Sequence, residues 1–573
     1  MSGVPPERKL KFVLLCNGPQ LQQWQREVLE LILDEGYAAP ELIVMPAKDN
    51  PSKSGWIKKI LHYPWSKLLF KKYYQYFFRP GIFKTVAFGD LMVNTRIIHC
   101  AVSLKGKYSE YFSENDIRLI KSHGPDFILK FGFGILRGDI LDCAPYGIWS
   151  FHHGDEQKFR GVPPAFWEIV KKERVTAAIL QRLTNKLDGG LILRKGYFPT
   201  ISHSWKGNLE QAIRLSVSWP ADVCRQVAML KSFPASEAGL TTLAPVYKIP
   251  GNLTFLRFLF LSLVNRIQFH FHEIFRAEQW QTGLIKMHAS ELLTAVNGKI
   301  DASLVTWIGA RQKHRYFADG FSIEARENLL LLYEDYSYQQ RKAHISASWF
   351  NAKEGSTSEA ITALSEPWHL SYPYLFTHEN KVYCVPESLE HGSVELYELK
   401  PATGKLEHVH CLVRGLAAAD ASLIYHHQRW YLFFTPAHAT NTELHLWHAD
   451  SLEGPFIPHI LSPVKADISN ARPGGRFIKI GEKLYRPAQN CTLTYGGSLI
   501  INEIKVLSET GFIEVPVATL EPPAGYSGLH TLSFAGGFLY FDVKKFVFIP
   551  SSSLFQFKKR LRLIKPAKAI QLL

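Results

Sequence analysis

Cysteine is scarce in this sequence, with seven residues among 573, at positions 16, 100, 143, 224, 384, 411 and 491. Their number is odd, and no two of them form a C-x-x-C pair. Disulfide scaffolds use even sets of cysteines, and cysteine-rich zinc modules use closely spaced pairs. Neither a disulfide framework nor a zinc cluster is therefore indicated.

Long hydrophobic runs are also missing. The first apolar run covers only about five residues before Asn17, far short of the apolar core of a signal peptide. The longest apolar stretch, Leu253–Val264, is interrupted by Arg257 and is shorter than the roughly 18 residues of a membrane-crossing helix. We expect no transmembrane helix, and we expect the protein to reside in the cytoplasm.

The sequence has ample material for folded domains. Its length predicts about two to four of them, which excludes a single small binding module. Hydrophobic residues make up 46% and charged residues 20%, the balance of a folded, mostly soluble protein. The 66 Lys and Arg exceed the 51 Asp and Glu, and the net charge of +15 suggests nucleic acid, an anionic membrane or acidic substrates as partners.

Two segments hold nearly all of this excess charge. Residues 47–84 contain nine Lys or Arg against Asp49 alone, and residues 555–573 contain six and no acid. The remainder is nearly neutral, so we expect no nucleic acid partner. Within 47–84, apolar residues recur at helical spacing and cations fall on another face, as in a helix lying in a membrane interface. The apolar set is Trp65, Leu68, Leu69, Tyr73 and Tyr76, and the cations are Lys67 and Lys71.

We therefore expect peripheral contact with the inner face of an anionic membrane through 48–84 and 555–568. A solvated or protein-docked basic insertion at 47–90 is the alternative. The apolar segment Leu253–Phe275 is expected to be an interdomain helix within a linker at 236–275, and 551–573 is expected to be a basic tail.

Residues 9–235 alternate between strand-like and helix-like patterns. Residues 12–16, 41–45 and 125–131 are apolar and strand-like, and 114–123 has a helical pattern. This alternation predicts an α/β domain with a Rossmann-like, largely parallel sheet. In such sheets, ligands bind beyond the carboxyl ends of the strands.

Residues 276–550 show an internal repeat instead. Short aromatic and β-branched runs follow anchor positions spaced 48 to 58 residues apart, which are Asp319, Tyr372, Asp420, Arg472 and His530. Five all-β units of this size predict a five-bladed β-propeller, with the anchors near the mouth of its central channel. An irregular β-sandwich is the alternative.

The motif most informative about chemistry is GIWSFHHGD at 147–155, followed by RGVPP at 160–164 and LDGG at 187–190. Across about residues 9–230 the sequence resembles the formyltransferase family, which includes methionyl-tRNA formyltransferase and amino-sugar N-formyltransferases. That family carries Asn-x-His, Arg-Gly-x-x-Pro and Leu-Asp-x-Gly. The spacing agrees when His152, rather than His153, is the matching histidine.

The resemblance implies roles for individual residues. His152 would take the proton of the attacking amine, and Asp188 would orient its imidazole. The loop at 130–137 would hold the pterin of 10-formyltetrahydrofolate, and Arg160 would contact the substrate. The loop residues concerned are Phe131, Gly132, Phe133, Gly134, Ile135 and Leu136. No metal is expected, since His-His-Gly-Asp has no further ligand at suitable spacing.

Ser150 stands where the family has its asparagine, the donor to the developing oxyanion. Loss of such a donor costs about 100- to 1000-fold in rate. Either Ser150 or His153 replaces the donor, or the acyl chemistry differs, or activity has been lost. The alternative is that Asp188 is a turn residue and Arg160 a loop cation.

Residues of about 275–550 resemble the propeller-like domain of plant glucosamine inositolphosphorylceramide transferases and, more loosely, five-bladed glycoside hydrolases. The matching segments are SYP at 371–373, VPES at 385–388, ARPGG at 471–475 and LYRPAQN at 484–490. Channel-facing residues would bind a carbohydrate, with Tyr372, Trp368 and Tyr495 at the rim. The expected binding set is Asp319, Tyr372, Glu387, Asp420, Arg472, Arg486 and Gln489.

Two functions compete. The first is an N-formyltransferase that moves a formyl group from 10-formyltetrahydrofolate to an amino sugar or related amine, with a carbohydrate-binding propeller. The methionyl-tRNA activity is disfavoured because no small basic tRNA-binding barrel follows. The second is a glycan-binding or glycan-processing protein whose formyltransferase fold is inactive; Asp319 with Glu387 or Asp420 would then be a glycosidase pair. The same acids would otherwise only lock the blades together.

Overall fold

The computed structural model describes residues 8–47, 65–105, 109–185, 189–233, 244–294, 300–309 and 314–560. The chain divides into two compact units, Met1–Arg266 and Ile267–Leu573. Within the described ranges, no helix has the length and apolar character needed to cross a membrane. Asp188 and much of the two basic segments, 48–64 and 561–573, lie outside the described residues.

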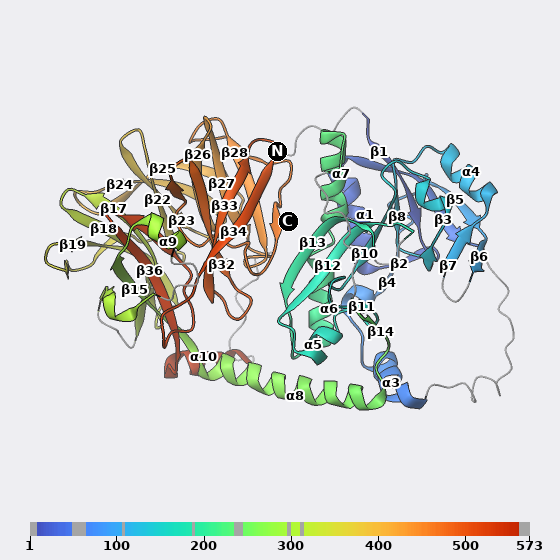
Figure 1. The fold of residues 1–573 in the computed structure, drawn as a ribbon, viewed down its shortest axis with the longest axis horizontal. Helices are drawn as coiled ribbons and strands as arrows, with labels where there is room; N and C mark the ends of the chain where they lie inside the picture. Colours follow the sequence, from blue (N-terminus) through green and yellow to red (C-terminus); the bar gives the residue numbers. More distant parts are fainter. Residues whose placement is uncertain are drawn as a thin grey trace. The chain divides into compact units, whose positions relative to one another are not determined.

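The first unit is built on a seven-stranded sheet (Figure 1). Strands β10, β8, β1, β3 and β5 run parallel in that order, and β12 and β13 continue the sheet antiparallel. The predicted α/β fold with a Rossmann-like parallel sheet is confirmed. The strands are β1 Leu10–Leu15, β3 Ala38–Pro46, β5 Arg96–Cys100, β8 Phe127–Lys130, β10 Ile148–His152, β12 Val175–Arg182 and β13 Leu191–Pro199.

Helices cover both faces of this sheet. On one face, Ile117 and Ile120 pack with Val13, Leu15 and Ile128 in a single apolar core. On the other face, Phe127 stacks on Phe12 and Trp149, with ring centroids 5.5 and 4.0 Å away. The helices are α1 Gln23–Glu35, α4 Glu114–Ser122, α5 Trp167–Lys171, α6 Trp205–Arg214 and α7 Trp219–Leu230.

Local sequence sets the helix ends. The Ser113 and Ser204 hydroxyls accept hydrogen bonds from the backbone N–H of Asp116 and Gly207 and so cap α4 and α6. Helix α1 stops at Gly36, whose φ of 75° suits glycine.

Short elements complete the first unit. They are β2 Gln20–Gln22 with β4 Thr85–Ala87, β6 Val102–Lys105 with β7 Ser109–Phe112 and β9 Ile135–Leu136, β11 Arg160–Gly161 with β14 Val246–Tyr247, and the 3₁₀ turns Trp65–Lys67, Gly81–Phe83 and Asp139–Asp142.

Helix α3, Leu68–Tyr76, lies in the predicted basic insertion and packs on the first turns of α8, Asn252–Phe275. The expected membrane-facing stripe included Tyr73. In the structure, Tyr73 instead packs on Phe255, 5.2 Å between ring centroids, while Trp65, Leu69 and Tyr76 are exposed. Helical spacing alone could not tell which side of α3 meets the protein.

The second unit consists largely of antiparallel strands in five sheets of the described chain. The first sheet, β16-β15-β36-β35, joins strands from both ends of the unit. Its strands are β15 Ala277–Lys286, β16 Thr306–Trp307, β35 Leu532–Ala535 and β36 Phe538–Val547. The helical elements of this unit are α9 Ala289–Thr294, the 3₁₀ turn Ala302–Leu304 and α10 Pro550–Arg560.

The other four sheets follow the chain order. They comprise β17 Arg315–Ala325, β18 Asn328–Ser337, β19 Lys342–Asn351, β20 Ser356–Thr357 and β21 Ile361–Leu364; β22 Ser371–His378, β23 Lys381–Glu387, β24 Ser393–Lys400 and β25 Lys405–Arg414; β26 Ala418–His426, β27 Arg429–Pro436, β28 Glu443–Ala449, β29 Ile457–Pro458 and β30 Lys465–Ala466; and β31 Ile478–Ile480, β32 Lys483–Asn490, β33 Ser498–Leu507 and β34 Phe512–Leu520.

Three of the predicted anchors coincide with irregularities in the sheets. The strand register shifts between Ala318 and Phe321, between Ser371 and Tyr374, and between Ala419 and Ser422. Asp319, Tyr372 and Asp420 have φ values of 49°, 42° and 50°. A bulge of this kind bends a strand and re-aims a side chain. The repeat in the sequence therefore reports a repeated backbone irregularity, with Asp319 inside its strand rather than at the start.

Candidate functional site

Ser150 and His152 lie near the carboxyl end of β10. Successive side chains of a strand point to opposite faces, so residues two apart share a face. Ser150 is in register with Lys130 of the parallel neighbour β8, which places Lys130 on that same face. Three polar side chains therefore share one face of the sheet near the edge where ligands of parallel sheets bind.

His153 is on the other side of the strand end. Its ring is stacked on Phe151 at 5.8 Å and lies edge-on to Trp24 of α1 at 5.6 Å. Burial lowers the pKa of His153 to about 3, so its imidazole is neutral. Between the two replacement donors considered, this placement favours Ser150, because Ser150 shares a face with His152.

Backbone hydrogen bonds to the end of β1 hold the loop that follows β8 in place. The N–H groups of Phe131 and Gly132 both donate to the Leu15 carbonyl, at 2.8 and 2.9 Å. A Cβ on Gly132 would lie 2.5 Å from Asn17 Oδ1 and 2.7 Å from the backbone nitrogen of Asn17, so only glycine fits there. The ring of Phe131 packs on Trp24 at 5.5 Å. The sequence analysis had not singled out Asn17, although it directly follows a buried strand.

Residues further along the loop are held in the same way. The Phe133 N–H donates to Asn17 Oδ1 at 2.8 Å, and the Gly134 N–H donates to Glu110 Oε2 at 2.6 Å. Ile135 and Leu136 form β9 beside β7. These N–H groups are engaged by the protein, and the Phe133 ring packs on Phe112 with 5.2 Å between ring centroids. The loop directly follows β8, the strand beside β10.

Lys130 begins the loop 130–137 that the sequence singled out, but the sequence assigned no role to its side chain. Burial lowers the pKa of its ammonium group, and the nearby Glu110 carboxylate opposes that shift. The available signal was a lysine ending an otherwise apolar strand. Only the strand register, which sets Lys130 beside Ser150, shows that this lysine belongs to the candidate site.

The remaining predicted residues of the first unit are placed differently. Arg160 lies in β11, and its Nη1 donates to the Ala244 carbonyl at 3.3 Å. Asp188 lies outside the described residues. Nearby, Lys195 Nζ contacts Asp155 Oδ1 at 3.2 Å and Glu156 at 2.9 Å. Asp155 of the His-His-Gly-Asp motif therefore forms an ion pair with Lys195.

Glu168, in α5, is a buried carboxyl that the sequence did not point to. Its side chain is 2% exposed. Burial raises its pKa to about 7, and the neighbouring Asp155 and Glu173 add to the effect. Near neutral pH the Glu168 carboxyl group is therefore partly protonated.

In the second unit, Asp420 is the centre of a buried polar cluster. Arg472 donates from Nε to Asp420 Oδ2 at 2.6 Å, and Gln489 donates to the same oxygen at 2.8 Å. The Asp420 N–H donates to Glu387 Oε2 at 3.0 Å. The Arg472 guanidinium also lies 4.8 Å from the centre of the Tyr495 ring. Four predicted binding residues thus come together.

Asp319 belongs to an adjoining group. His530 Nδ1 lies 2.6 Å from Asp542 Oδ2, and His530 Nε2 lies 3.3 Å from Asp319 Oδ1. Against the effect of burial, these carboxylates raise the pKa of His530. The spacing of Asp319, His530 and Asp542 would suit a metal ion. The two carboxylates favour the protonated form of the His530 imidazole, and a proton on a ring nitrogen competes with a metal for its lone pair.

Two acids of the cluster hold protons unusually well. Burial raises the pKa of Asp319 to about 6 and that of Asp420 to about 7, although Arg472 opposes the second shift. Raised carboxyl pKa values are typical of general acids and also of buried structural acids.

All seven predicted binding residues of the second unit are buried, and two of them have their polar groups engaged outside the Asp420 cluster. Arg486 forms a paired contact with Glu514, at 2.8 and 2.6 Å, and bonds the carbonyls of Asn470 and Ala471. Tyr372 is fully buried, and its hydroxyl contacts Ser422 and Gly475. The expected rim position of Tyr372 is therefore not found, because its hydroxyl joins neighbouring strands.

Comparison with known proteins agrees with both resemblances. A family profile described as "Glucosamine inositolphosphorylceramide transferase 1, N-terminal" matches residues 298–524. The rice (Oryza sativa subsp. japonica) protein of that name is 34% identical over 212 residues, 35% of this chain and 28% of that protein. A methionyl-tRNA formyltransferase of Clostridium perfringens (strain 13 / Type A) is 34% identical over 98 residues, 17% of this chain and 32% of that protein. The chain therefore spans less than a third of either relative.

Solved structures show weaker likenesses. The sugar 3N-formyl transferase WlaRD, with dTDP and 5-N-formyl-THF, is 13% identical with a TM-score of 0.26, covering 42% of this chain and 70% of that one. The family 117 glycoside hydrolase Zg3597 of Zobellia galactanivorans is 13% identical with a TM-score of 0.31, covering 47% and 91%. Likenesses this low carry no argument about function.

Proposed function

We propose that this protein is an N-formyltransferase that moves a formyl group from 10-formyltetrahydrofolate to an amino sugar or related amine. The observation that carries the proposal is the meeting of Ser150, His152 and Lys130 at the carboxyl edge of the parallel sheet, beside the loop Phe131–Gly134. The local similarity to methionyl-tRNA formyltransferase supports it. The proposed location is the cytoplasm, at the inner face of a membrane.

In the proposed reaction, the amine nitrogen bonds to the formyl carbon while the bond from that carbon to the donor nitrogen breaks. His152 takes a proton from the amine, a task suited to a side chain that titrates near neutral pH. The donor nitrogen recovers a proton as it leaves. Asp188 is proposed to orient His152.

Negative charge develops on the formyl oxygen as the amine attacks. A preorganised donor there contributes about 100- to 1000-fold in rate. We propose that the Ser150 hydroxyl and the Lys130 ammonium group share the task that an asparagine performs in the resembled family. A cation in a buried setting stabilises negative charge more strongly than a neutral amide does.

The five sheets of the second unit are proposed to be blades of a propeller whose buried cluster supports a carbohydrate-binding mouth. The relatives that match this unit are named for a glucosamine-containing lipid, which supports an amino-sugar acceptor. Glu387, Asp420, Arg472 and Gln489 are the residues proposed to support the mouth, because hydrogen bonds and an ion pair join them.

The test is turnover. Purified full-length protein is given 10-formyltetrahydrofolate and a panel of amino sugars, and release of tetrahydrofolate is measured. We expect release with at least one amino sugar, its loss in His152→Ala and Asp188→Asn, and its retention in His123→Ala, a histidine that contacts Glu41 instead. Absence of turnover together with absence of folate-analogue binding by calorimetry would refute the proposal.

The raised carboxyl pKa values favour a second candidate, a glycan-processing site in an otherwise inactive formyltransferase fold. Asp319 and Asp420 retain protons to about pH 6 and 7. A general acid in glycoside hydrolysis needs such a proton. This candidate predicts release of reducing sugar from some glycan, lost in Asp420→Asn, with no release of tetrahydrofolate.

A further inference from the structure

The first part of α8 is apolar on two opposite sides. Phe255 and Phe258 are buried against the aromatic side chains of Phe70, Phe166 and Trp205. On another side, apolar residues recur at helical spacing and are exposed: Leu253 by 83%, Leu256 by 51%, Phe260 by 65% and Leu263 by 58%. A surface helix ordinarily carries polar residues there. No described residue of the first unit covers this stripe.

Helix α3 and the turn before it extend this surface. Trp65, Tyr76 and Phe77 are exposed by 62%, 53% and 75%. Asn252 ties the two segments together, since its Nδ2 donates to the Trp65 carbonyl at 2.9 Å and its Oδ1 accepts from the Leu69 N–H at 3.1 Å. Figure 1 shows α3 beside the start of α8. We call the exposed apolar residues of 65–77 and 253–263 the α3–α8 surface.

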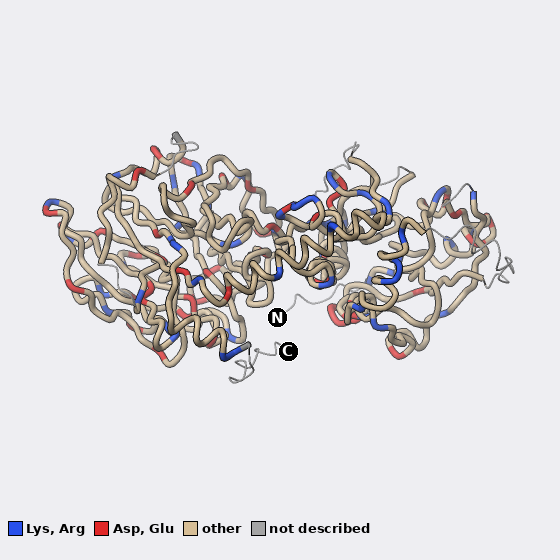
Figure 2. Tube along the Cα trace, turned by 90° about the horizontal axis from the view of Figure 1, so that it is seen from below, with Lys and Arg blue, Asp and Glu red and all other residues tan. Residues whose placement is uncertain are grey.

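The charged residues of the two segments that form this surface are all basic. Neither 65–84 nor 252–266 contains Asp or Glu, while Lys72, Arg79, Arg257 and Arg266 are exposed. Figure 2 marks the Lys and Arg positions along the backbone in blue and the Asp and Glu positions in red. Such a combination of apolar stripe and cations matches an anionic lipid surface. A second copy of the chain is a poorer partner, because a two-fold contact would set these cations against themselves.

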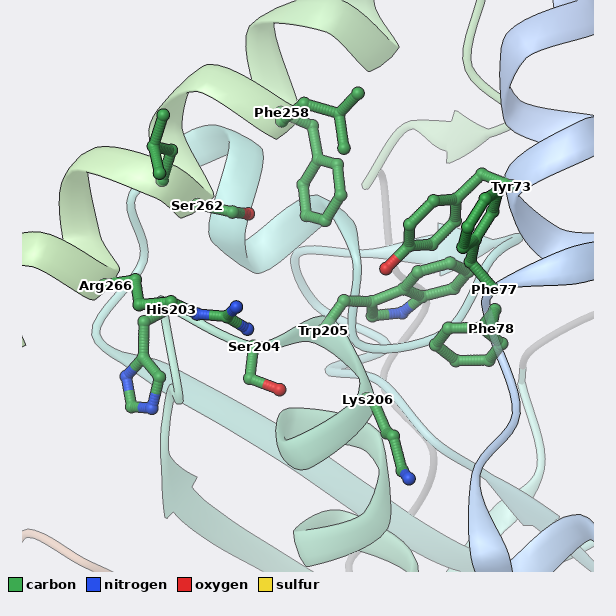
Figure 3. Close-up of a pocket in the computed structure, with 12 residues that line it drawn as sticks. Tyr73, Phe77, Phe78, His203, Ser204, Trp205, Lys206, Phe258, Ser262 and Arg266 are labelled. Carbon is green, nitrogen blue, oxygen red and sulfur yellow. The ribbon is translucent and has the colours of Figure 1, made fainter. Parts of the chain in front are cut away.

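A pocket opens beside the surface, between α3, α8 and the start of α6. Its volume is about 360 Å³, and its lining includes Tyr73, Phe78, Trp205, Lys206 and Arg266. Figure 3 shows the Arg266 guanidinium reaching from α8 toward Ser204 and Trp205. Phe78 stacks on Trp205 with 3.7 Å between ring centroids. The pocket thus joins an aromatic wall to cationic groups.

Ser262 also faces this pocket from α8 (Figure 3). Its hydroxyl oxygen is shielded from solvent and has no hydrogen-bond partner among the described residues. Shielded polar atoms in native proteins are nearly always bonded. A phosphate oxygen in the pocket would satisfy this hydroxyl and pair with Arg266.

We propose that the α3–α8 surface docks on an anionic phospholipid bilayer and that the adjacent pocket takes up the phosphate of a lipid head group. The apolar stripe enters the interface, and the exposed cations face the anionic leaflet. This docking is independent of the proposed formyl transfer. It uses α8, whose role from sequence was only that of an interdomain helix.

Vesicle flotation of the full-length protein tests the docking. The vesicles are phosphatidylcholine with and without phosphatidylserine, at low and high salt. We expect binding to the anionic vesicles that weakens with salt. The double variant Leu256→Asp, Phe260→Asp should bind roughly tenfold more weakly or worse, since it removes two apolar insertions. Val93→Asp with Met229→Asp, which are exposed apolar residues elsewhere in the unit, should bind as the parent does.

A pair of variants on one helix tests the pocket. Arg257 and Arg266 are both exposed on α8, but only Arg266 lines the pocket. Arg257→Ala should lower binding about fivefold through loss of one cation near the leaflet. Arg266→Ala should lower it roughly tenfold further, because a charge-assisted hydrogen bond is lost as well.

Four results would count against the proposal. The parent protein fails to float with anionic vesicles at low salt, or the Leu256→Asp, Phe260→Asp variant floats equally well. Alternatively, sedimentation shows that this variant turns a dimer into a monomer without changing flotation, which would assign the surface to a second copy. Equal losses for Arg257→Ala and Arg266→Ala would refute the head-group pocket. Formyl transfer is measured on the same samples, so its failure is distinguished from failure of docking.

Discussion

Ser150 allows the sharpest test at the scale of single residues. If its hydroxyl donates to the formyl oxygen in the transition state, Ser150→Ala should lower kcat by about 100-fold with little change in KM. Ser150→Thr keeps a hydroxyl and should retain most of the activity. The measurement is steady-state release of tetrahydrofolate. Equal rates for the Ala variant and the parent would show that Lys130 or another group acts alone.

Lys130 is tested in the same assay. Lys130→Met preserves the length of the buried side chain and removes its charge. We expect kcat to fall by about 100-fold if the ammonium group stabilises the developing charge. The matched control is Lys121→Met, at an exposed position on α4 of the same unit. A lowered unfolding midpoint with unchanged kcat would make Lys130 a structural residue.

Glu168 predicts a pH dependence of stability. Its pKa is about 7 in the folded protein and 4.5 ordinarily, so the folded state binds its proton more tightly. Its contribution to the free energy of unfolding is therefore present below pH 4.5 and is lost as the pH rises to 7. Glu168→Gln should be more stable than the parent at pH 8, by up to about 3 kcal/mol, and equally stable at pH 4.

Denaturant unfolding at the two pH values measures this difference. Glu114→Gln is the control, because Glu114 is exposed on α4 of the same unit and is not among the groups that shift the pKa of Glu168. A Glu168→Gln difference that does not vary with pH would show that Glu168 stays charged in the folded state.

At the scale of elements, the loop after β8 depends on its glycines. A Cβ at Gly132 would collide with the backbone of Cys16 and Asn17, just after β1. Gly132→Ala should therefore destabilise the protein by about 2 kcal/mol and weaken folate-analogue binding. Gly18→Ala is the matched control, since nothing lies within 4 Å of its added Cβ. Thermal unfolding and calorimetric titration give the two values. Unchanged binding in Gly132→Ala would remove the loop from the proposed donor site.

Elements were predicted from sequence where their patterns are local. The strand at 125–131 and the helix at 114–123 were expected within a few residues of β8 and α4. The orientation of α3 could not be predicted, because its apolar residues cover more than one side of the helix. The contact between Tyr73 and Phe255 shows which side faces the protein.

At the scale of the whole molecule, the sheets of the second unit are linked through buried ion pairs. Arg472 donates a hydrogen bond to Asp420 and lies 3.8 Å from Glu387. Asp420 is in β26, Glu387 is in β23 of another sheet, and Arg472 lies in the connection between β30 and β31. Arg472→Met should destabilise the protein by about 3–5 kcal/mol, since it leaves buried carboxylates without their cation. Lys353→Met, in an exposed pair with Glu327, should change stability by less than about 1 kcal/mol.

Denaturant unfolding followed by tryptophan fluorescence measures both variants. If Arg472→Met is as stable as the parent, the cluster is not what joins the sheets, and a ligand-binding role for Arg472 gains support.

The sequence by itself determined the features that repeat or alternate along the chain. Alternating strand and helix patterns indicated the α/β class of the first unit, and motif spacing singled out His152 as the candidate base. Three of the five regular anchors coincide with the bulges found in the second unit. These signals are local, because a period of two or 3.6 residues depends only on neighbours.

Only the tertiary structure decided which distant residues meet. Lys130 stands beside Ser150 because β8 and β10 are neighbours in register, and the Asp319 N–H meets Asp542 across 223 residues of sequence. It also paired Arg486 with Glu514 and left one side of α8 exposed. Strand order and helix packing follow from the sum of many weak contacts, which no single segment of the sequence records.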